Sequence, residues 1–420
     1  MKSLARIYFR LLAGMILRRY KPTVIAIAGS VGKTATKEAV AAAIANDKRL
    51  IRKTEGNFNG EVGVPATIMS GGGAPTSIAG WLGILWRGKK QAVFGGMYPE
   101  ALVLELGADH PGDLAPLLHL ARPTIGVLTS AAPEHLEFFG SEEGVVAEES
   151  LVVRQLPSDG TAVVNIDDPR VAEVVTKLKC KVISYGWSGE ASIKAESIAI
   201  SKDEHGLPNG MVAKVSLDGS TIPIALPGVL GRHQVYPILA AIAVGRVLGD
   251  EAMSVIQRLS SYVPPPGRMR LFHGRDGSLI IDDSYNASPE AVQAALNTLH
   301  ELEIPGKRIA VLGQMSELGA AATEWHDRIG REITKLRVDV LVTVGPLADR
   351  IGNAAIEAGM DAKNVYNVAN AEAAAATVQP MLTPGVAVLL KGSHFASQLE
   401  KAVAILLDNP ERDQKFLVHS

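Results

Sequence analysis

The feature that most constrains this chain is a glycine-rich segment between a short apolar run and a helical pattern. Residues 23–29 (TVIAIAG) are apolar and β-branched, and residues 34–46 have the spacing of a helix. Glycines let backbone N–H groups turn inward around phosphates, and the start of the next helix adds a partial positive charge. The pattern predicts a nucleotide-phosphate site on a parallel α/β sheet. The loop itself reads Gly29, Ser30, Val31, Gly32, Lys33, Thr34.

Two side chains of this loop and one carboxylate further on predict how ATP and Mg²⁺ are held. Lys33 is expected to reach the β- and γ-phosphates, and the Thr34 hydroxyl is expected to ligate Mg²⁺. An earlier glycine of the usual motif is Ile27 here, which leaves the shorter form GxxGKT. Glu105 ends the apolar run 101–106, where a carboxylate faces the ligand crevice of a parallel sheet and suits Mg²⁺. The alternative is that Glu105 caps the next helix.

Strand and helix patterns alternate along the chain, which predicts α/β domains with mostly parallel sheets. With 420 residues, two or three domains are expected. Residues 190–226 alternate in short runs with turns, typical of antiparallel hairpins, and the three prolines of 262–268 cannot continue a helix. We therefore expect an N-terminal amphipathic helix, a central ATP-binding domain with a small antiparallel appendage and a C-terminal doubly wound, Rossmann-like domain. Their ranges are 1–22, 23–262 and 263–420; residues 71–100 receive no assignment.

The N-terminal helix has two possible roles. Its charged interruptions and the lack of a small-residue cleavage site fit neither a spanning helix nor a signal peptide. It either packs on the next domain or lies on an anionic membrane surface, which would place the protein at the inner face of the membrane. The predicted apolar face contains Leu4, Ile7, Tyr8, Leu11, Leu12, Met15 and Ile16, with Lys2, Arg6 and Arg10 opposite.

Charge and cysteine content exclude several function classes. The formal net charge is −2, so nothing global indicates a nucleic-acid partner. Cys180 is the single cysteine, which excludes a disulfide framework and a cysteine zinc site and fits the cytoplasm. We expect a monomer.

Four segments, in their order and spacing, resemble the Mur ligases of peptidoglycan precursor synthesis. They are 29–34, 55–65 (EGNFNGEVGVP), 104–114 (LELGADHPGDL) and 131–141 (AAPEHLEFFGS). The resemblance implies ATP-dependent amide-bond formation through an acyl-phosphate. It also implies metal or catalytic roles for Glu105 and His135, and substrate contacts from Asn57 and Asn59, whose alternative is an ordinary turn. A lone histidine such as His135 is otherwise more often structural.

One departure from the family concerns a lysine that becomes carbamylated and holds a second metal ion. This chain reads GVVAEES at 144–150, with no lysine. We predict that the Glu149 carboxylate replaces the carbamate. The alternative is that Glu148 and Glu149 are ordinary surface residues of a helix.

The C-terminal segments 267–270 (GRMR) and 281–291 (IDDSYNASPEA) also match the family, in which the D-alanyl-D-alanine-adding branch is the most similar. The DDSYN run, with LELGADHPGD in 104–113, favours this cell-wall branch over folylpolyglutamate synthase, which shares the fold. Segments 311–319 and 389–400 also match the family, except that Gln314 and His394 differ from its usual residues. A further departure is Pro237, which stands where the family usually has an asparagine near the nucleotide. The alternative for Asp282 and Asp283 is helix capping. The resemblance implies nucleotide contacts from Arg268, Asp283 and Asn286, and substrate contacts from Tyr285, Ser288, His326, Lys391 and Ser393.

The acceptor has more than one possible identity, because the phosphate loop begins at residue 29. The family's usual N-terminal domain, which holds the uridine-diphosphate end of the substrate, does not fit before it. The expected substrates are a UDP-MurNAc-peptide and an amino acid or dipeptide such as D-alanyl-D-alanine. The alternatives are a lipid-linked, non-nucleotide peptide or polyglutamate-type acceptor, and a non-catalytic ATP-binding scaffold.

Overall fold

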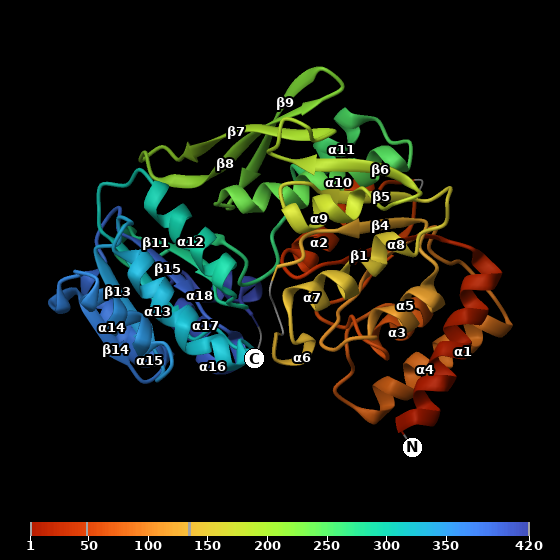
Figure 1. The fold of residues 1–420 in the computed structure, drawn as a ribbon, viewed down its shortest axis with the longest axis horizontal. Helices are drawn as coiled ribbons and strands as arrows, with labels where there is room; N and C mark the ends of the chain where they lie inside the picture. Colours follow the sequence, from red (N-terminus) through yellow and green to blue (C-terminus); the bar gives the residue numbers. More distant parts are fainter. Residues whose placement is uncertain (1, 48, 133–135, 419–420) are drawn as a thin grey trace. The chain divides into compact units, whose positions relative to one another are not determined.

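The computed structural model describes residues 2–47, 49–132 and 136–418, which form two compact units (Figure 1). Neither unit is one continuous stretch of the chain, because parts of the hairpin region belong to each unit. Unit 1 comprises Met1–Glu196, Lys214–Ile224 and Tyr236–Tyr262, and unit 2 comprises Ser197–Ala213, Ala225–Val235 and Val263–Ser420. The contiguous domain ranges expected from the sequence stay a prediction.

The first sheet has nine strands in the order β2-β3-β1-β4-β5-β6-β7-β8-β9. Strands β1 to β6 pair in parallel, and the central strands β1, β3, β4 and β5 are apolar and almost fully buried. Short turns join the last three strands into hairpins, one of them with positive φ at Asp218 and Gly219. The strands are β1 (Thr23–Ala28), β2 (Ile51–Lys53), β3 (Ala101–Glu105), β4 (Ile125–Leu128), β5 (Thr161–Asn165), β6 (Lys181–Gly186), β7 (Ile193–Lys202), β8 (Pro208–Leu217) and β9 (Ser220–Pro227).

Helices cover both faces of the parallel part of this sheet. One face packs against α1 (Lys2–Tyr20), α3 (Gly63–Ser70), α4 (Ile78–Val93), α5 (Leu114–Ala121), α8 (Leu151–Arg154) and α9 (Pro169–Val175). Helix α2 (Lys33–Ile44) contacts β1 and β3, and α11 (Ala252–Leu259) packs on α2. The remaining helices here are α6 (Leu136–Phe139), α7 (Glu142–Glu149) and the apolar α10 (Val235–Val247). Helix α4 lies in the segment that the sequence left unassigned.

Helix α1 packs on its neighbours α3, α4 and α5 through a face that, among the described side chains, overlaps the predicted one only at Leu12 and Ile16. Phe9, Leu12, Ala13 and Ile16 are buried, and most of the predicted apolar face stays exposed. The sequence pattern was misleading because both sides of this helix are apolar. Among the described residues, no helix is both long and apolar enough to cross a bilayer.

Unit 2 contains a six-stranded sheet in the order β10-β11-β15-β12-β13-β14, parallel except for the edge strand β10. Helices α12, α13 and α14 cover one face and α15 and α17 the other, which is the doubly wound arrangement expected. The strands are β10 (Arg270–His273), β11 (Leu279–Asp283), β12 (Arg308–Gly313), β13 (Val340–Val344), β14 (Val365–Val368) and β15 (Ala387–Lys391). The helices are α12 (Pro289–Glu301), α13 (Ala322–Ile333), α14 (Asp349–Glu357), α15 (Ala371–Val378), α16 (His394–Ser397), α17 (Leu399–Leu406) and α18 (Pro410–Asp413). The predicted fold class is confirmed for both sheets.

Candidate active site

The phosphate loop follows β1 and is braced by the segment after β4. The Ser30 N–H donates to the Ser130 carbonyl at 3.0 Å, and the Val31 N–H donates to the Ser130 hydroxyl at 3.0 Å. Gly29 has a φ of 129°, and a Cβ there would lie 2.3 Å from the Thr129 hydroxyl oxygen. Only glycine fits this position, so the loop is held in one shape before any ligand arrives.

The first residues of α2 carry the predicted phosphate-binding side chains. The Lys33 Nζ donates to the carbonyls of Gly29 and Ser30, the latter at 3.0 Å, so the ammonium lies back over the loop. The Thr34 hydroxyl donates to Glu105 Oε1 at 3.2 Å. A cation and a hydroxyl therefore lie at the start of one helix, next to backbone N–H groups.

Glu105 ends β3, directly beside β1, with which β3 pairs from Thr23 to Ile27. Its carboxylate is buried and accepts a hydrogen bond from Asn59 Nδ2 at 3.1 Å. The Lys37 Nζ lies 3.1 Å from Glu105 Oε2 and donates to the Gly56 carbonyl at 3.0 Å. The alternative that Glu105 caps the next helix is wrong, because its partners come from α2 and the Asn59 loop.

Lys37 is a site neighbour that the sequence analysis missed. It is fully buried although charged, since its ion pair with Glu105 compensates for lost hydration. A signal was present in the sequence, because Lys37 follows Lys33 by four residues and so shares its helix face.

The two glutamates at the end of α7 are buried, so the alternative that they are surface residues is wrong. Glu149 Oε2 accepts the Gly29 N–H at 2.7 Å, which places this carboxylate at the phosphate loop. Glu148 accepts the N–H groups of Gly112 and Leu114 at 3.0 Å and 2.8 Å, and so caps the start of α5. The two neighbours therefore differ in what they contact, and only Glu149 touches the loop.

Other predicted residues of unit 1 are placed less tightly. Asn57 is exposed, and its carbonyl accepts the Asn59 N–H at 2.8 Å as in a turn. His135 lies outside the described residues. Within the described residues, no three Asp, Glu, His or Cys side chains form a group that would hold a metal ion by themselves. The oxygen donors of Thr34 and Glu105 suit Mg²⁺, which commonly completes its shell with phosphate oxygens and water.

In unit 2 the predicted residues gather at the carboxyl ends of β11 and β15. Lys391 Nζ lies 2.5 Å from Asp283 Oδ2 and donates to the Asn286 carbonyl at 3.0 Å, and both charged side chains are buried. Asp283 Oδ1 also accepts the Met269 N–H at 3.1 Å. This pair fixes the loop after β11 to the end of β15.

The aspartates before this loop do not cap the next helix. Ser288, which is also buried, holds the N-cap position of α12, and Asp282 accepts the backbone N–H and the hydroxyl of Ser284 at 3.1 Å and 2.6 Å. The capping alternative is therefore wrong. Burial raises the pKa of Asp282 to about 6 and lowers the pKa of His233, which faces Asp283, to about 4.

An aromatic stack lies on the same edge of the sheet. The guanidinium of Arg268 lies 4.5 Å from the centre of the Tyr285 ring. The Tyr285 ring is parallel to that of His394, with 6.3 Å between centres, and His394 Nδ1 lies 3.2 Å from Glu400 Oε1. Arg268 and Tyr285, predicted for different ligands, are thus in contact with each other.

Two predicted substrate residues, His326 and Ser393, accept hydrogen bonds from the backbone of the loop that follows β12. His326 is fully buried, its Nε2 accepts the Met315 N–H at 3.0 Å, and its Nδ1 lies 2.6 Å from the Ala322 carbonyl. Burial lowers its pKa. The Ser393 hydroxyl accepts the Ser316 N–H at 3.1 Å. Both side chains therefore help to hold residues 315 and 316 in place.

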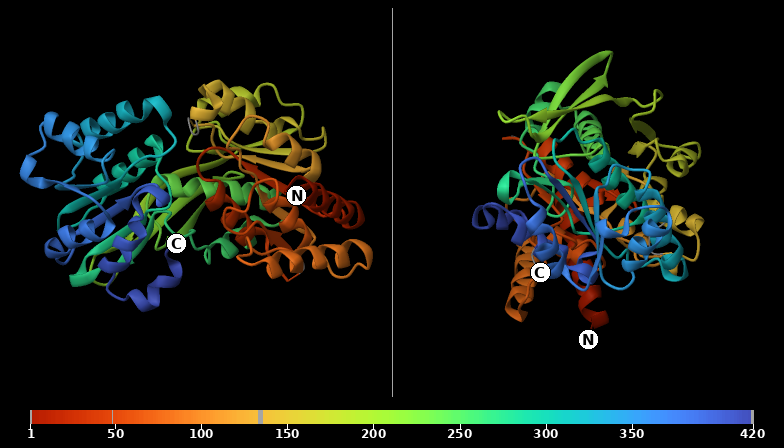
Figure 2. Two further views of the ribbon diagram at one scale, coloured as in Figure 1. Left: turned by 90° about the horizontal axis from the view of Figure 1, so that it is seen from below. Right: turned by 90° about the vertical axis from the view of Figure 1, so that its left-hand side faces the viewer.

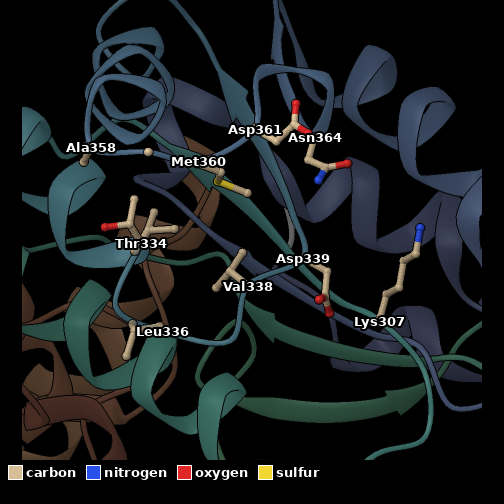
Figure 3. Close-up of a pocket in the computed structure, with 11 residues that line it drawn as sticks. Lys307, Thr334, Leu336, Val338, Asp339, Ala358, Met360, Asp361 and Asn364 are labelled. Carbon is tan, nitrogen blue, oxygen red and sulfur yellow. The ribbon is translucent and has the colours of Figure 1, made fainter.

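Figure 3 shows a hollow of about 490 Å³ in unit 2, lined by Lys307, Asp339, Asp361 and Asn364 among others. Lys307 and Asp339 directly precede β12 and β13, so the hollow lies at the amino ends of these strands. The predicted site residues of unit 2 lie at the carboxyl ends, where parallel sheets bind ligands. The hollow is therefore separate from the candidate site.

Comparisons with known proteins agree with this geometry. Residues 91–245 match the Mur ligase middle domain, and residues 267–394 match the Mur ligase, glutamate ligase domain. The UDP-N-acetylmuramoyl-tripeptide--D-alanyl-D-alanine ligase of Mycobacterium tuberculosis (strain CDC 1551 / Oshkosh) is 32% identical over 407 residues, which cover 92% of this chain and 73% of the relative. The ligase of the same name from Bacillus subtilis (strain 168) is 28% identical, covering 95% and 79%.

Solved structures extend the likeness to three dimensions. The MurF ligase from Thermotoga maritima in complex with ADP superposes with a TM-score of 0.77 at 28% identity, covering 95% of this chain and 83% of that one. The folylpolyglutamate synthase of Mycobacterium tuberculosis, at 16% identity and a TM-score of 0.66, shares the fold.

Fold and site together define an ATP-dependent ligase of the class that forms amide bonds. The chain belongs to the Mur ligase family, as the ordered motifs of the sequence had indicated.

Proposed function

We propose that this chain adds D-alanyl-D-alanine to a UDP-MurNAc-peptide in peptidoglycan precursor synthesis, with ATP as the energy source. The observation that carries the proposal is the cluster of Lys33, Thr34 and Glu105 around a preformed phosphate loop. The substrate assignment is supported by the names of the relatives, which are D-alanyl-D-alanine ligases of UDP-N-acetylmuramoyl-tripeptide. A relative solved in complex with ADP supports nucleotide binding by this chain.

The proposed roles in unit 1 follow from the charges that must meet. A substrate carboxylate attacks the γ-phosphate, the γ-phosphoryl group passes to it, and ADP leaves. Two anionic groups must therefore approach each other. Lys33 and the N–H groups of residues 29–34 offset this repulsion and stabilise charge that develops on the γ-oxygens. Thr34, Glu105, His135 and Glu149 would hold Mg²⁺, which neutralises phosphate charge when bound. Lys37 holds the Glu105 carboxylate in place through its 3.1 Å contact.

The acyl-phosphate that results is attacked by the amine, which displaces phosphate and forms the amide. We propose that Arg268, Asp283 and Asn286 contact the nucleotide. We propose substrate contacts for Asn57, Asn59, Tyr285, Ser288, Lys391 and Ser393, with His326 ordering the loop 314–316 beside them. Positioning of the amine next to the acyl-phosphate supplies much of the rate. A cytoplasmic location and a monomeric state stay predictions.

The substrate panel that tests the proposal measures phosphate release by the purified chain. ATP, Mg²⁺, UDP-MurNAc-tripeptide and D-alanyl-D-alanine are supplied together and with each component left out. Release that needs both the carboxylate and the amine substrate is expected. No phosphate release with this pair, but release with a lipid-linked, peptide or polyglutamate acceptor, would overturn the substrate assignment and leave the ligase chemistry standing. ATP binding without release on any acceptor would favour a non-catalytic scaffold.

Glu149→Gln is expected to raise the Mg²⁺ concentration for half-maximal activity about 10- to 100-fold, the usual range for groups that tune a metal site. The amide oxygen can still accept the Gly29 N–H, so the change removes charge and keeps the loop contact. Glu143→Gln, an exposed residue of the same helix, is the matched control. An unchanged Mg²⁺ titration for Glu149→Gln would contradict the metal role. Glu149→Lys should regain activity only with added bicarbonate.

A further inference from the structure

Helix α1 buries one face in unit 1 and presents a second apolar face to solvent. Ile7, Leu11 and Met15 are 53%, 56% and 42% exposed, and their spacing of four residues places them in one line along the helix. The buried residues Phe9, Leu12, Ala13 and Ile16 lie on another side. Packing within the chain therefore explains why one face of α1 is apolar, but it does not explain the second, exposed apolar face.

Helix α4 lies beside α1 and runs parallel to it (Figures 1 and 2). The Phe9 and Trp81 rings lie 5.9 Å apart near the first turns, and the Tyr20 hydroxyl donates to the Gln91 carbonyl at 3.4 Å near the last. Arg19 also donates to the Ala92 and Val93 carbonyls. These contacts hold the two helices as one layer at the edge of unit 1.

Helix α4 has an exposed apolar line of the same kind. Ile78, Leu82 and Trp86, again four residues apart, are 80%, 60% and 65% exposed. Phe94 and Met97, just beyond the helix, are 78% and 88% exposed. Single exposed apolar residues are common on soluble proteins, but two lines on adjacent helices are unusual. We call the apolar residues Ile7, Leu11, Met15, Ile78, Leu82, Trp86, Phe94 and Met97 the α1–α4 surface.

The charge of these two helices identifies what could cover the surface. Helices α1 and α4 contain eight basic residues and no acidic residue, in a chain whose net charge is −2. Arg18, Arg87 and Lys89 are exposed, and the Lys90 ammonium lies 5.4 Å from the centre of the Trp86 ring. Arg6 pairs with the Glu61 carboxylate at 2.7 Å, which offsets one of these charges. The partner must therefore be both apolar and negatively charged.

We propose that the α1–α4 surface docks on a lipid bilayer that contains anionic lipids. Apolar side chains with an indole enter the boundary between headgroups and acyl chains, and the flanking Lys and Arg side chains contact lipid phosphates. Both helices lie flat rather than cross, in keeping with the lack of a spanning helix among the described residues. The docked enzyme would work beside the membrane, whichever acceptor it uses.

The test is co-sedimentation of the full chain with vesicles of neutral phosphatidylcholine, with and without 30% phosphatidylglycerol. Binding to the anionic vesicles is expected to be at least tenfold tighter, and weaker at high salt, because each basic side chain near the surface contributes about fivefold. The indole emission should shift to shorter wavelength on binding, and Trp86→Phe should remove most of that shift.

Two variants separate the apolar and electrostatic contributions. Leu82→Ser with Trp86→Ser, and separately Arg87→Glu with Lys89→Glu, should each weaken binding at least tenfold. The controls are Met253→Ser, an apolar residue 61% exposed on α11, and Lys177→Glu, which is exposed and distant in sequence. The circular dichroism and the turnover without vesicles should be unchanged in all four, which shows that each still folds.

Three results would overturn the proposal. One is equal or absent binding to both vesicle types, and another is binding that both α4 variants leave intact. The third is a wild-type dimer, seen by analytical ultracentrifugation, that Leu82→Ser with Trp86→Ser dissociates while vesicles bind neither protein. That result would make the α1–α4 surface a contact between two copies.

Discussion

Lys33→Ala is expected to lower turnover about 100- to 1000-fold, the loss typical of removing one preorganised group that stabilises transition-state charge. The Lys33 ammonium lies over the phosphate loop, held by the Gly29 and Ser30 carbonyls, so it is placed before ATP binds. No other lysine takes its place, because the neighbouring Lys37 is committed to Glu105 and Gly56. The measurement is phosphate release at saturating ATP and both substrates.

The matched control is Lys177→Ala, whose exposed ammonium pairs with Glu173 at 2.8 Å and lies on no proposed site. Its turnover should equal that of the wild type. Lys33→Ala should keep the wild-type thermal unfolding profile, since its side chain is only partly buried. If Lys33→Ala turns over at the rate of Lys177→Ala, the proposed chemistry at the phosphate loop is wrong.

Lys391→Met is expected to lower the free energy of unfolding of unit 2 by about 3–5 kcal/mol. The change leaves the Asp283 carboxylate buried without its cation, and hydrogen bonding to the Met269 N–H compensates only in part. Asp283→Asn combined with Lys391→Met should recover part of the loss, because no uncompensated charge then remains. Urea unfolding followed by a probe in unit 2, such as Trp325, reports the change.

The control for this pair is Lys335→Met, which breaks an exposed ion pair with Glu332 at 2.9 Å. A surface pair of this kind contributes about 0–1 kcal/mol. A loss for Lys391→Met no greater than that for Lys335→Met would show that the Lys391–Asp283 pair does not hold unit 2 together. A double variant less stable than Lys391→Met would mean that buried charge is not the cause.

Much of the fold could be predicted because its strands are short, apolar and regularly separated. Residues 23–29 end in a glycine-rich loop, and this local pattern places β1, the loop and α2 without any long-range information. The doubly wound unit 2 follows from the same alternation. The face that α1 buries could not be predicted, because Phe9 and Ile7 are equally apolar and only the neighbouring helices select between them.

The sequence predicted which residues to consider for the site, but not the contacts between them. Glu105 and Thr34 were both expected near Mg²⁺, and they lie 3.2 Å apart through the pairing of β1 with β3. Lys37, which shares the Glu105 carboxylate, was missed because a lysine within a helix usually points to solvent. His326 was expected at the substrate, whereas burial and two backbone partners make it a support of its loop.

The sequence by itself determined the nucleotide-phosphate site of this protein, because a phosphate loop needs glycines, a lysine and a hydroxyl close together in one strand–loop–helix. Tertiary structure decided which distant charges meet. Glu149 reaches the Gly29 N–H, and Lys391 reaches Asp283, across separations of more than 100 residues. It also decided that α1 and α4 each keep a line of apolar side chains exposed. Such pairings depend on how strands order within a sheet and how helices pack on it, and no local pattern specifies either.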